Sequence, residues 1–132
     1  MSAHRVVAGV LVSGPRVLLG HRSRGRRWYP GVWDVVGGHV EPGEDERAAL
    51  LRELREEIGV EATGVDGEPV LRVTEDDLHL AVYAVRTWEG EPRNLQPHEH
   101  DELRWVTAGE ARGLALAHPS YADLVERLAG PD

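Results

Sequence analysis

One segment in the first half of the chain limits the possible folds more than any other. Its apolar side chains recur at spacings of three and four, the period of an amphipathic helix: Leu51, Leu54 and Ile58. Pro42-Gly43 precedes this pattern and Gly59 follows it, and a glycine just after the last periodic residue is a common helix end. We therefore predict a helix over Glu44–Ile58 with its apolar side against the core.

The segments around this helix are rich in β-branched and aliphatic residues, which favours strands. We predict strands over 6–12, 17–19, 70–74, 78–88 and 103–106. Thr107 and Glu110 form a capping box that begins a short helix, and a last helix is predicted over 119–128. Strands interleaved with helices indicate the α/β class. Because no repeat or linker divides the 132 residues, we expect a single domain over 1–132.

Composition excludes several kinds of chemistry. The chain has no cysteine and no lysine, so disulfides, thiolate zinc sites, cysteine nucleophiles and lysine Schiff bases are excluded. A net charge of −8 disfavours duplex nucleic acid as a partner. The apolar run 6–12 is too short for a signal peptide or a membrane span. We therefore expect a cytoplasmic protein without a membrane or duplex nucleic-acid partner.

Three carboxylates gather on one side of the predicted helix. Glu53, Glu56 and Glu57 stand at positions i, i+3 and i+4, where like charges repel. A hard divalent cation such as Mg²⁺ or Mn²⁺ would explain the cluster, because these ions prefer oxygen ligands. A charged, solvent-exposed helix face is the alternative interpretation for an isolated E-x-x-E-E.

The residues around these glutamates fit a longer pattern, G-x5-E-x7-R-E-U-x-E-E-x-G-U, in which U is a bulky aliphatic residue. Its fixed positions are all filled, by Gly38, Glu44, Arg52, Glu53, Glu56, Glu57 and Gly59. The stretch GGHVEPGEDERAALLRELREEIGV resembles the Nudix box of the Nudix hydrolases, with the box itself over 38–60. The resemblance implies the Nudix fold, a mixed β-sheet sandwiched between helices, and hydrolysis of a nucleoside diphosphate linked to a further group, with Mg²⁺ or Mn²⁺ as cofactor.

The resemblance also implies roles for individual box residues. The expected metal ligands are the carboxylates Glu53, Glu56 and Glu57 and the backbone carbonyl of Gly38. Glu53 or one of its partners would take the proton from the attacking water. Arg52 would orient a glutamate through a bidentate contact, and Glu44 would support the loop. Which glutamate is the general base stays open, because carboxylates on a shared metal titrate together.

A further acid is expected from a loop outside the box. Glu99 is the first candidate, as both metal ligand and catalytic residue, and Glu102 is the second. The alternative is an exposed acidic loop. A metal pair made of His98 and His100 is less favoured, because carboxylates suit a hard cation better than imidazoles do.

Arginines gather before the box in an otherwise acidic chain. We expect Arg22, Arg24 and Arg27 to bind substrate phosphates, and Arg22 aligns with the phosphate-contacting arginine of MutT-type members. A solvated loop that balances the local charge is the alternative. Ala117 and His118 stand where MutT-type enzymes specific for oxidised guanine have an asparagine, so recognition of 8-oxoguanine is not expected.

These observations together predict a Nudix pyrophosphohydrolase. We expect it to cleave a nucleoside triphosphate into a monophosphate and pyrophosphate, by attack of water on phosphorus. A nucleotide-sugar or ADP-ribose pyrophosphatase is the first alternative, and a catalytically silent nucleotide-sensing module is the second. The expected partner is a small nucleotide. A homodimer is left open.

Overall fold

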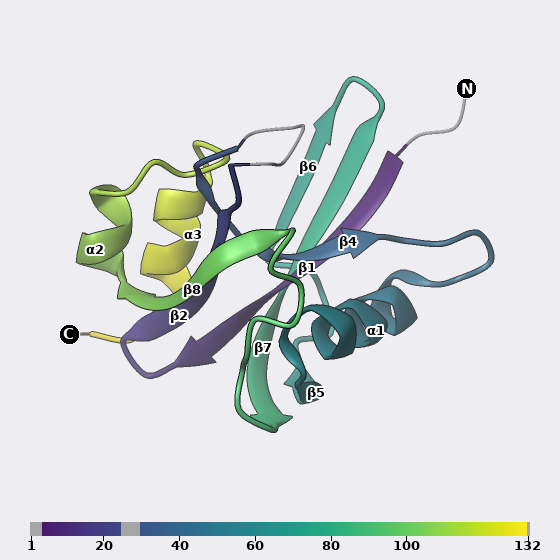
Figure 1. Ribbon diagram of the computed structural model, residues 1–132, viewed down its shortest axis with the longest axis horizontal. Coiled ribbons are helices and arrows are strands. Elements are labelled where there is room, and N and C mark those ends of the chain that lie inside the picture. Colours follow the sequence, from purple (N-terminus) through teal and green to yellow (C-terminus); the bar gives the residue numbers. More distant parts are fainter. Residues whose placement is uncertain (1–3, 25–29, 132) are drawn as a thin grey trace.

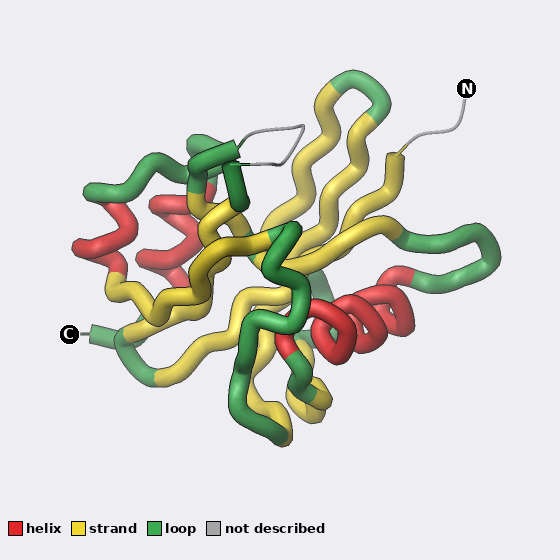
Figure 2. The backbone as a smooth tube through the Cα atoms, in the orientation of Figure 1, coloured by secondary structure: helices red, strands yellow, loops and turns green. Residues whose placement is uncertain are grey.

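The computed structural model describes residues 4–24 and 30–131, and Figures 1 and 2 show the arrangement of its elements. The strands are β1 (His4–Ser13), β2 (Arg16–Arg22), β3 (Trp33–Asp34), β4 (Val36–His39), β5 (Glu61–Val65), β6 (Leu71–Glu75), β7 (Leu78–Glu89) and β8 (His100–Thr107). The helices are α1 (Glu46–Ile58), α2 (Ala108–Arg112) and α3 (Tyr121–Leu128). No helix among the described residues is long and apolar enough to cross a membrane.

The strands form one mixed sheet built around β1. β1 runs parallel to β7 over most of its length and antiparallel to β4 over Val6–Gly9, and its last two residues pair antiparallel with the start of β2. β7 also pairs with β5 and β6, whereas β2 pairs with β3 and β8. β1 therefore joins two groups of strands. One group contains β2, β3 and β8, and the other contains β5, β6 and β7.

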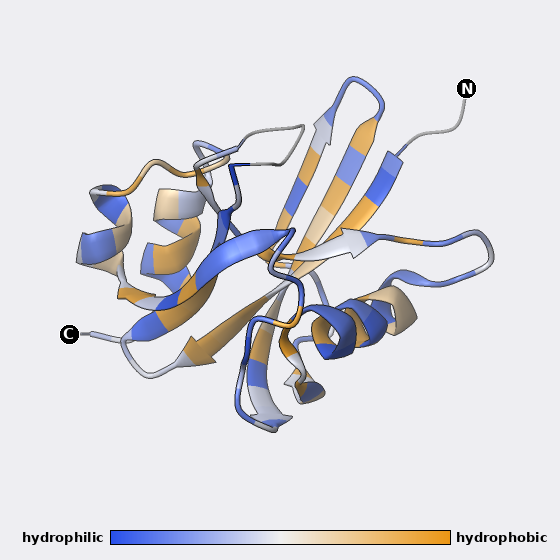
Figure 3. Cartoon of the chain, in the orientation of Figure 1, coloured by the Kyte–Doolittle hydropathy of each residue, from blue (hydrophilic) through white to orange (hydrophobic). Residues whose placement is uncertain are grey.

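Helices cover both faces of this sheet. Val7 and Leu11 of β1 pack in the same apolar cluster as α1, whereas Ala8 and Val10 belong to the cluster that contains α2 and α3. This alternation follows from the strand period of two, which sends successive side chains to opposite faces. Figure 3 shows the apolar residues gathered along the strands. The predicted sheet between helices is confirmed.

Helix α1 begins and ends at well-defined caps. The Asp45 side chain accepts a hydrogen bond from the Ala48 N–H at 2.7 Å, so the helix begins at Glu46 and not at the predicted Glu44. Gly59 ends it in the left-handed conformation, with φ 70°, as the sequence predicts. Leu50, Leu54 and Ile58 are fully buried, each contributing about 2 kcal/mol, while Leu51 is only partly buried.

The remaining predictions differ from the structure mainly at boundaries. The capping box of α2 is present, and the four inward residues of α3 are buried: Tyr121, Leu124, Val125 and Leu128. α3 begins at Tyr121 and not at Pro119. β5 was not predicted, because its sequence EATGV alternates only weakly and contains Gly64. β8 begins three residues earlier than predicted, at His100.

Candidate active site

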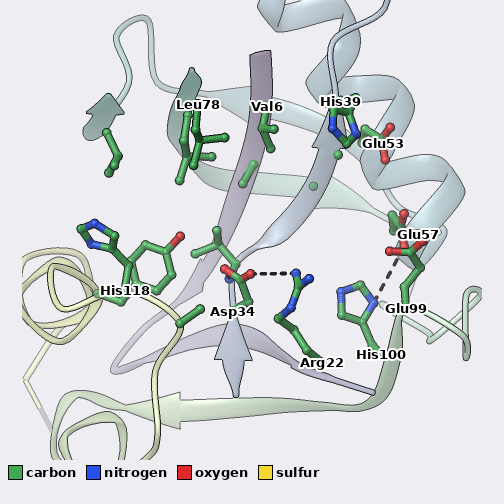
Figure 4. A pocket seen from close by; sticks show the side chains of 18 of the residues that line it. Val6, Arg22, Asp34, His39, Glu53, Glu57, Leu78, Glu99, His100 and His118 are labelled. Carbon is green, nitrogen blue, oxygen red and sulfur yellow. Dashed lines mark hydrogen bonds and ion pairs between the residues drawn. The ribbon is translucent and has the colours of Figure 1, made fainter. Parts of the chain in front are cut away.

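A cavity of about 480 Å³ lies between the two groups of strands and has two chemically different ends. Its acidic end contains Gly37, Gly38, Glu53, Glu57 and Glu99. Its distal end is mostly apolar and contains Val6, Val73, Leu78, Leu80, Ala117 and Tyr121, with Glu75 and His118 at its rim. Figure 4 shows the acidic side chains on one side and His118 on the other.

Two glycines of β4 let the backbone pass close to α1 and β1. A Cβ at Gly38 would lie 2.4 Å from the Glu53 carboxylate, so this position leaves room for the acidic side chain. A Cβ at Gly37 would lie 1.9 Å from the Val7 carbonyl oxygen, so here glycine is needed for strand packing. The close approach of Gly38 is therefore present; its carbonyl as a metal ligand stays a prediction.

Arg52 organises the glutamates of α1. Its guanidinium donates to both carboxylate oxygens of Glu44, at 2.8 and 2.9 Å, and to Glu53 at 2.9 Å. It also reaches Glu56 at 3.3 Å and the His39 carbonyl at 3.0 Å. The bidentate contact lowers the pKa of the Glu44 carboxyl to about 2. The geometry expected for Arg52 is thus present, with Glu44 as its bidentate partner.

The three glutamates of the helix do not share one environment. Glu53 and Glu57 are buried and line the cavity, whereas the Glu56 side chain is 53% exposed and is not among the cavity-lining residues. Burial raises the pKa of Glu53, and the neighbouring Arg52 opposes that shift. The predicted roles of Glu56 in catalysis and metal binding stay predictions, and they would require its side chain to turn toward the cavity.

Glu99 reaches the helix glutamates through a loop that also caps α1. The N–H groups of Arg93 and Leu95 donate to the carbonyls of Ile58 and Glu57, at 2.9 and 3.0 Å. These bonds satisfy carbonyls that the end of a helix leaves unpaired. Glu99 then lines the cavity and raises the pKa of Glu53 through its charge. The same loop thus ends the helix and delivers Glu99 to the cavity.

The second candidate for the loop acid lies elsewhere. The Glu102 side chain is 47% exposed and pairs with Arg104 at 3.0 Å on β8, so the structure does not bring it into the cavity. His98 and His100 also diverge: His100 is buried beside Glu57, whereas His98 is not among the cavity-lining residues. Glu99 is therefore the loop acid that the fold places beside the box.

Arg22 lies in the middle of the cavity and pairs with Asp34 at 3.2 Å, as Figure 4 shows. Asp34 also accepts from the Val35 N–H at 2.8 Å and from the Tyr121 hydroxyl. Burial raises the pKa of Asp34 and also that of Tyr121. Sequence reasoning missed Asp34, although a carboxylate between apolar Trp33 and Val35 was a usable signal.

Two further arginines are predicted to bind substrate phosphates. Arg24 is exposed in a turn and is not among the cavity-lining residues, and Arg27 lies outside the described residues. Their predicted contacts with substrate phosphates stay predictions.

The donor atoms at the acidic end suit a hard divalent cation. Carboxylates from α1 and from the loop share one cavity with the backbone of β4, and oxygen atoms are the ligands that such a cation prefers. As they stand, no three acidic or imidazole side chains of residues 4–24 and 30–131 converge enough to enclose an ion, and Arg52 holds Glu53. Cation binding therefore requires these side chains to turn toward one another.

Comparison with known proteins decides the family. Residues 3–128 match the family model described as NUDIX domain, which covers nearly the whole chain. The chain belongs to the Nudix family. The resemblance inferred from the box is thereby confirmed, and this Nudix chain is a pyrophosphohydrolase of a family whose members generally need a divalent metal.

Individual relatives support the same assignment. The Nudix chain is 38% identical, over 96% of its own length and 91% of the relative's, to a protein of Escherichia coli K12 named CTP pyrophosphohydrolase. It is 42% identical, over 80% and 74% of the two lengths, to the Mycobacterium tuberculosis protein named "Putative 8-oxo-dGTP diphosphatase 2". The solution structure of the E. coli ORF135 protein matches with a TM-score of 0.77 and 36% identity, over 96% of this chain and 88% of that one.

Proposed function

We propose that this Nudix chain hydrolyses a nucleoside triphosphate to a monophosphate and pyrophosphate, with Mg²⁺ or Mn²⁺ as its cofactor. The observation that carries the proposal is the division of one cavity into an acidic end, a central Arg22 and an apolar distal end. A nucleotide has matching parts, because its phosphates carry charge and its base is flat and weakly polar. The cavity volume of about 480 Å³ lies in the range of small-molecule sites.

The acidic end is assigned to the cation and the reacting phosphates. Glu53, Glu57 and Glu99, with the carbonyl of Gly38, would hold the ion, and Glu56 would join them by turning inward. The cation, when bound, neutralises phosphate charge and lowers the pKa of the attacking water. Arg52 keeps the Glu53 carboxylate close to the β4 backbone.

A buried glutamate is the proposed general base for the attacking water. Glu53 is the first candidate, because it is buried, lines the cavity and is held by Arg52. Glu57 and Glu99 line the same cavity and remain alternatives for this step. Arg22, held by Asp34, supplies positive charge between the two ends for a phosphate or for the leaving pyrophosphate.

The distal end is assigned to the base. Leu78 and Leu80 of β7 and Tyr121 of α3 line the cavity, which provides apolar surface for a flat ring. The name of the E. coli relative makes CTP and dCTP the first substrates to test. The name of the M. tuberculosis relative makes 8-oxo-dGTP the second, although no asparagine stands at 117 or 118.

The test is pyrophosphate release from a panel of nucleoside triphosphates, nucleotide sugars and ADP-ribose, with and without Mg²⁺ or Mn²⁺. We expect cation-dependent release of pyrophosphate from at least one triphosphate, and a fall in kcat of at least 100-fold, about 3 kcal/mol, in Glu53→Gln and Glu57→Gln. Glu102→Gln is the control, because Glu102 lies outside the cavity. Full activity in both box variants would contradict the proposed roles, and turnover of ADP-ribose alone would replace the substrate class.

A further inference from the structure

A buried histidine lines the cavity beside its acidic end. The side chain of His100 is 5% exposed, and its Nδ1 lies 3.8 Å from Oε2 of Glu57, whose own side chain is 10% exposed. Figure 4 shows the imidazole directed at the Glu57 carboxylate from the start of β8. The distance is longer than a hydrogen bond, but a proton on Nδ1 would turn the positive end of the imidazole toward the carboxylate, and such an attraction is strong between groups shielded from water.

The backbone keeps this imidazole in place. The His100 N–H donates to the Gln96 carbonyl at 3.1 Å, and the Asn94 side-chain amide donates to the His100 carbonyl at 2.6 Å. The ring lies over Gly20 of β2, where an added Cβ would come within 2.6 Å of its Cδ2. β2 therefore leaves the space that the ring fills, and the ring has little freedom to turn away from Glu57.

The position of Glu57 gives this contact a chemical consequence. Glu57 lines the cavity together with Glu53, Glu99 and His100, and the His100 ring lies beside its carboxylate. Carboxylates that bind metals are themselves held by partners behind them, and loss of such a partner typically weakens metal binding 10- to 100-fold. An ordinary packing histidine would fill the space over Gly20 without affecting cation affinity.

We propose that His100 is a positioning residue of the cation site, which orients the Glu57 carboxylate through its Nδ1. The inference rests on the proposed function, because it requires that Glu57 bind the cation. It extends that function to the first residue of β8. Glu99 reaches the cavity, and His100, the next residue, fixes a glutamate of the helix.

The test is Mn²⁺ affinity, measured from the electron paramagnetic resonance signal of free Mn²⁺ over the full chain without nucleotide. His100→Phe keeps a ring over Gly20 but has no nitrogen, and we expect it to bind Mn²⁺ at least 10-fold more weakly. His100→Asn places an amide near the position of Nδ1, and we expect an affinity within about 3-fold of the wild type. The matched control is His98→Asn, which changes a histidine two residues earlier, not among the cavity-lining residues, and should leave the affinity unchanged.

A double-mutant cycle separates positioning from general packing. If His100 acts through Glu57, His100→Phe should have no further effect on Mn²⁺ affinity in a Glu57→Gln background. An equal loss in both backgrounds, or a wild-type affinity in His100→Phe, overturns the proposal. If His100→Phe does not fold, His100→Gln is compared with His100→Asn, because glutamine places its amide near Nε2. Equal affinities in that pair also overturn it.

The outcomes distinguish this inference from the proposed function. Wild-type protein that binds no Mn²⁺ and releases no pyrophosphate contradicts the function itself. Wild-type protein that binds Mn²⁺ and turns over nucleotide, with His100→Phe equally tight, contradicts only the role of His100.

Discussion

At the scale of single residues, adjacent glycines of β4 have different roles. Gly38 faces the flexible Glu53 carboxylate, whereas Gly37 faces the rigid backbone of β1. The same substitution should therefore have different effects at the two positions.

We expect Gly38→Ala to fold and to lose activity. Its methyl group would lie 2.4 Å from the Glu53 carboxylate and would therefore displace it. The fall in kcat should be at least 10-fold, with the midpoint of thermal unfolding changed by no more than a few degrees. Gly37→Ala should instead lose about 2 kcal/mol or more of unfolding free energy, because the backbone cannot move aside. Steady-state kinetics and urea unfolding of both variants test these expectations. Equal free energies of unfolding in Gly37→Ala and Gly38→Ala would contradict the prediction.

The Arg52–Glu44 contact has a defined pH dependence. The pKa of Glu44 is lowered from 4.5 to about 2, so the folded state holds its proton less tightly than the unfolded state does. The stabilisation is therefore fully present above pH 4.5 and is lost as the pH falls toward about 2. We expect the difference in unfolding free energy between wild type and Glu44→Gln to shrink across that window. A difference that stays constant from about pH 6 to about pH 2 would show that the contact contributes nothing through ionisation.

At the scale of elements, the end of α1 positions the loop that leads to Glu99. Gly59 takes φ 70°, and an added Cβ would come within 3.1 Å of Leu95 in the loop that leads to Glu99. A residue with a side chain in this conformation costs about 1–2 kcal/mol.

We expect Gly59→Ala to lower the free energy of unfolding by about 1–2 kcal/mol, measured by urea denaturation. Gly113→Ala is the matched control, because Gly113 ends α2 with φ −90° and an added Cβ would meet only ordinary contacts. It should stay within about 0.5 kcal/mol of the wild type. A loss of equal size at both positions would mean that the left-handed conformation is not the cause.

The elements also show what sequence alone could predict. The long helix, the long strands and the capping box were predictable because each depends on a local period or on neighbouring residues. β5 was not, because EATGV owes its strand conformation to pairing with β7. The burial of His100 and Asp34 was also missed, since it depends on Gly20 and Tyr121, which are far away in the sequence.

At the scale of the whole molecule, the acidic end raises an electrostatic problem. A chain of net charge −8 whose cavity holds Glu53, Glu57 and Glu99 repels a triphosphate unless a cation lies between them. Affinity for the cation should therefore be measurable as added stability of the fold.

We expect Mn²⁺ at about 100 times its dissociation constant to stabilise the folded chain by about 2.7 kcal/mol, because the unfolded chain has no assembled site. Differential scanning calorimetry should show a raised midpoint that EDTA reverses, and a smaller rise in Glu57→Gln. An unchanged wild-type midpoint at saturating Mn²⁺ would contradict this prediction.

The two ends of the cavity come from separate stretches of the chain. The acidic end is made by the segment 37–57 and the loop before β8, whereas Glu75 of β6 and His118 before α3 meet across the distal rim at 3.5 Å. Under the proposed function, reaction chemistry and choice of nucleobase would be encoded in separate stretches of the chain. Substitutions in β6, β7 and the connection before α3 would then change the preferred nucleotide without altering the residues proposed to break the phosphoanhydride.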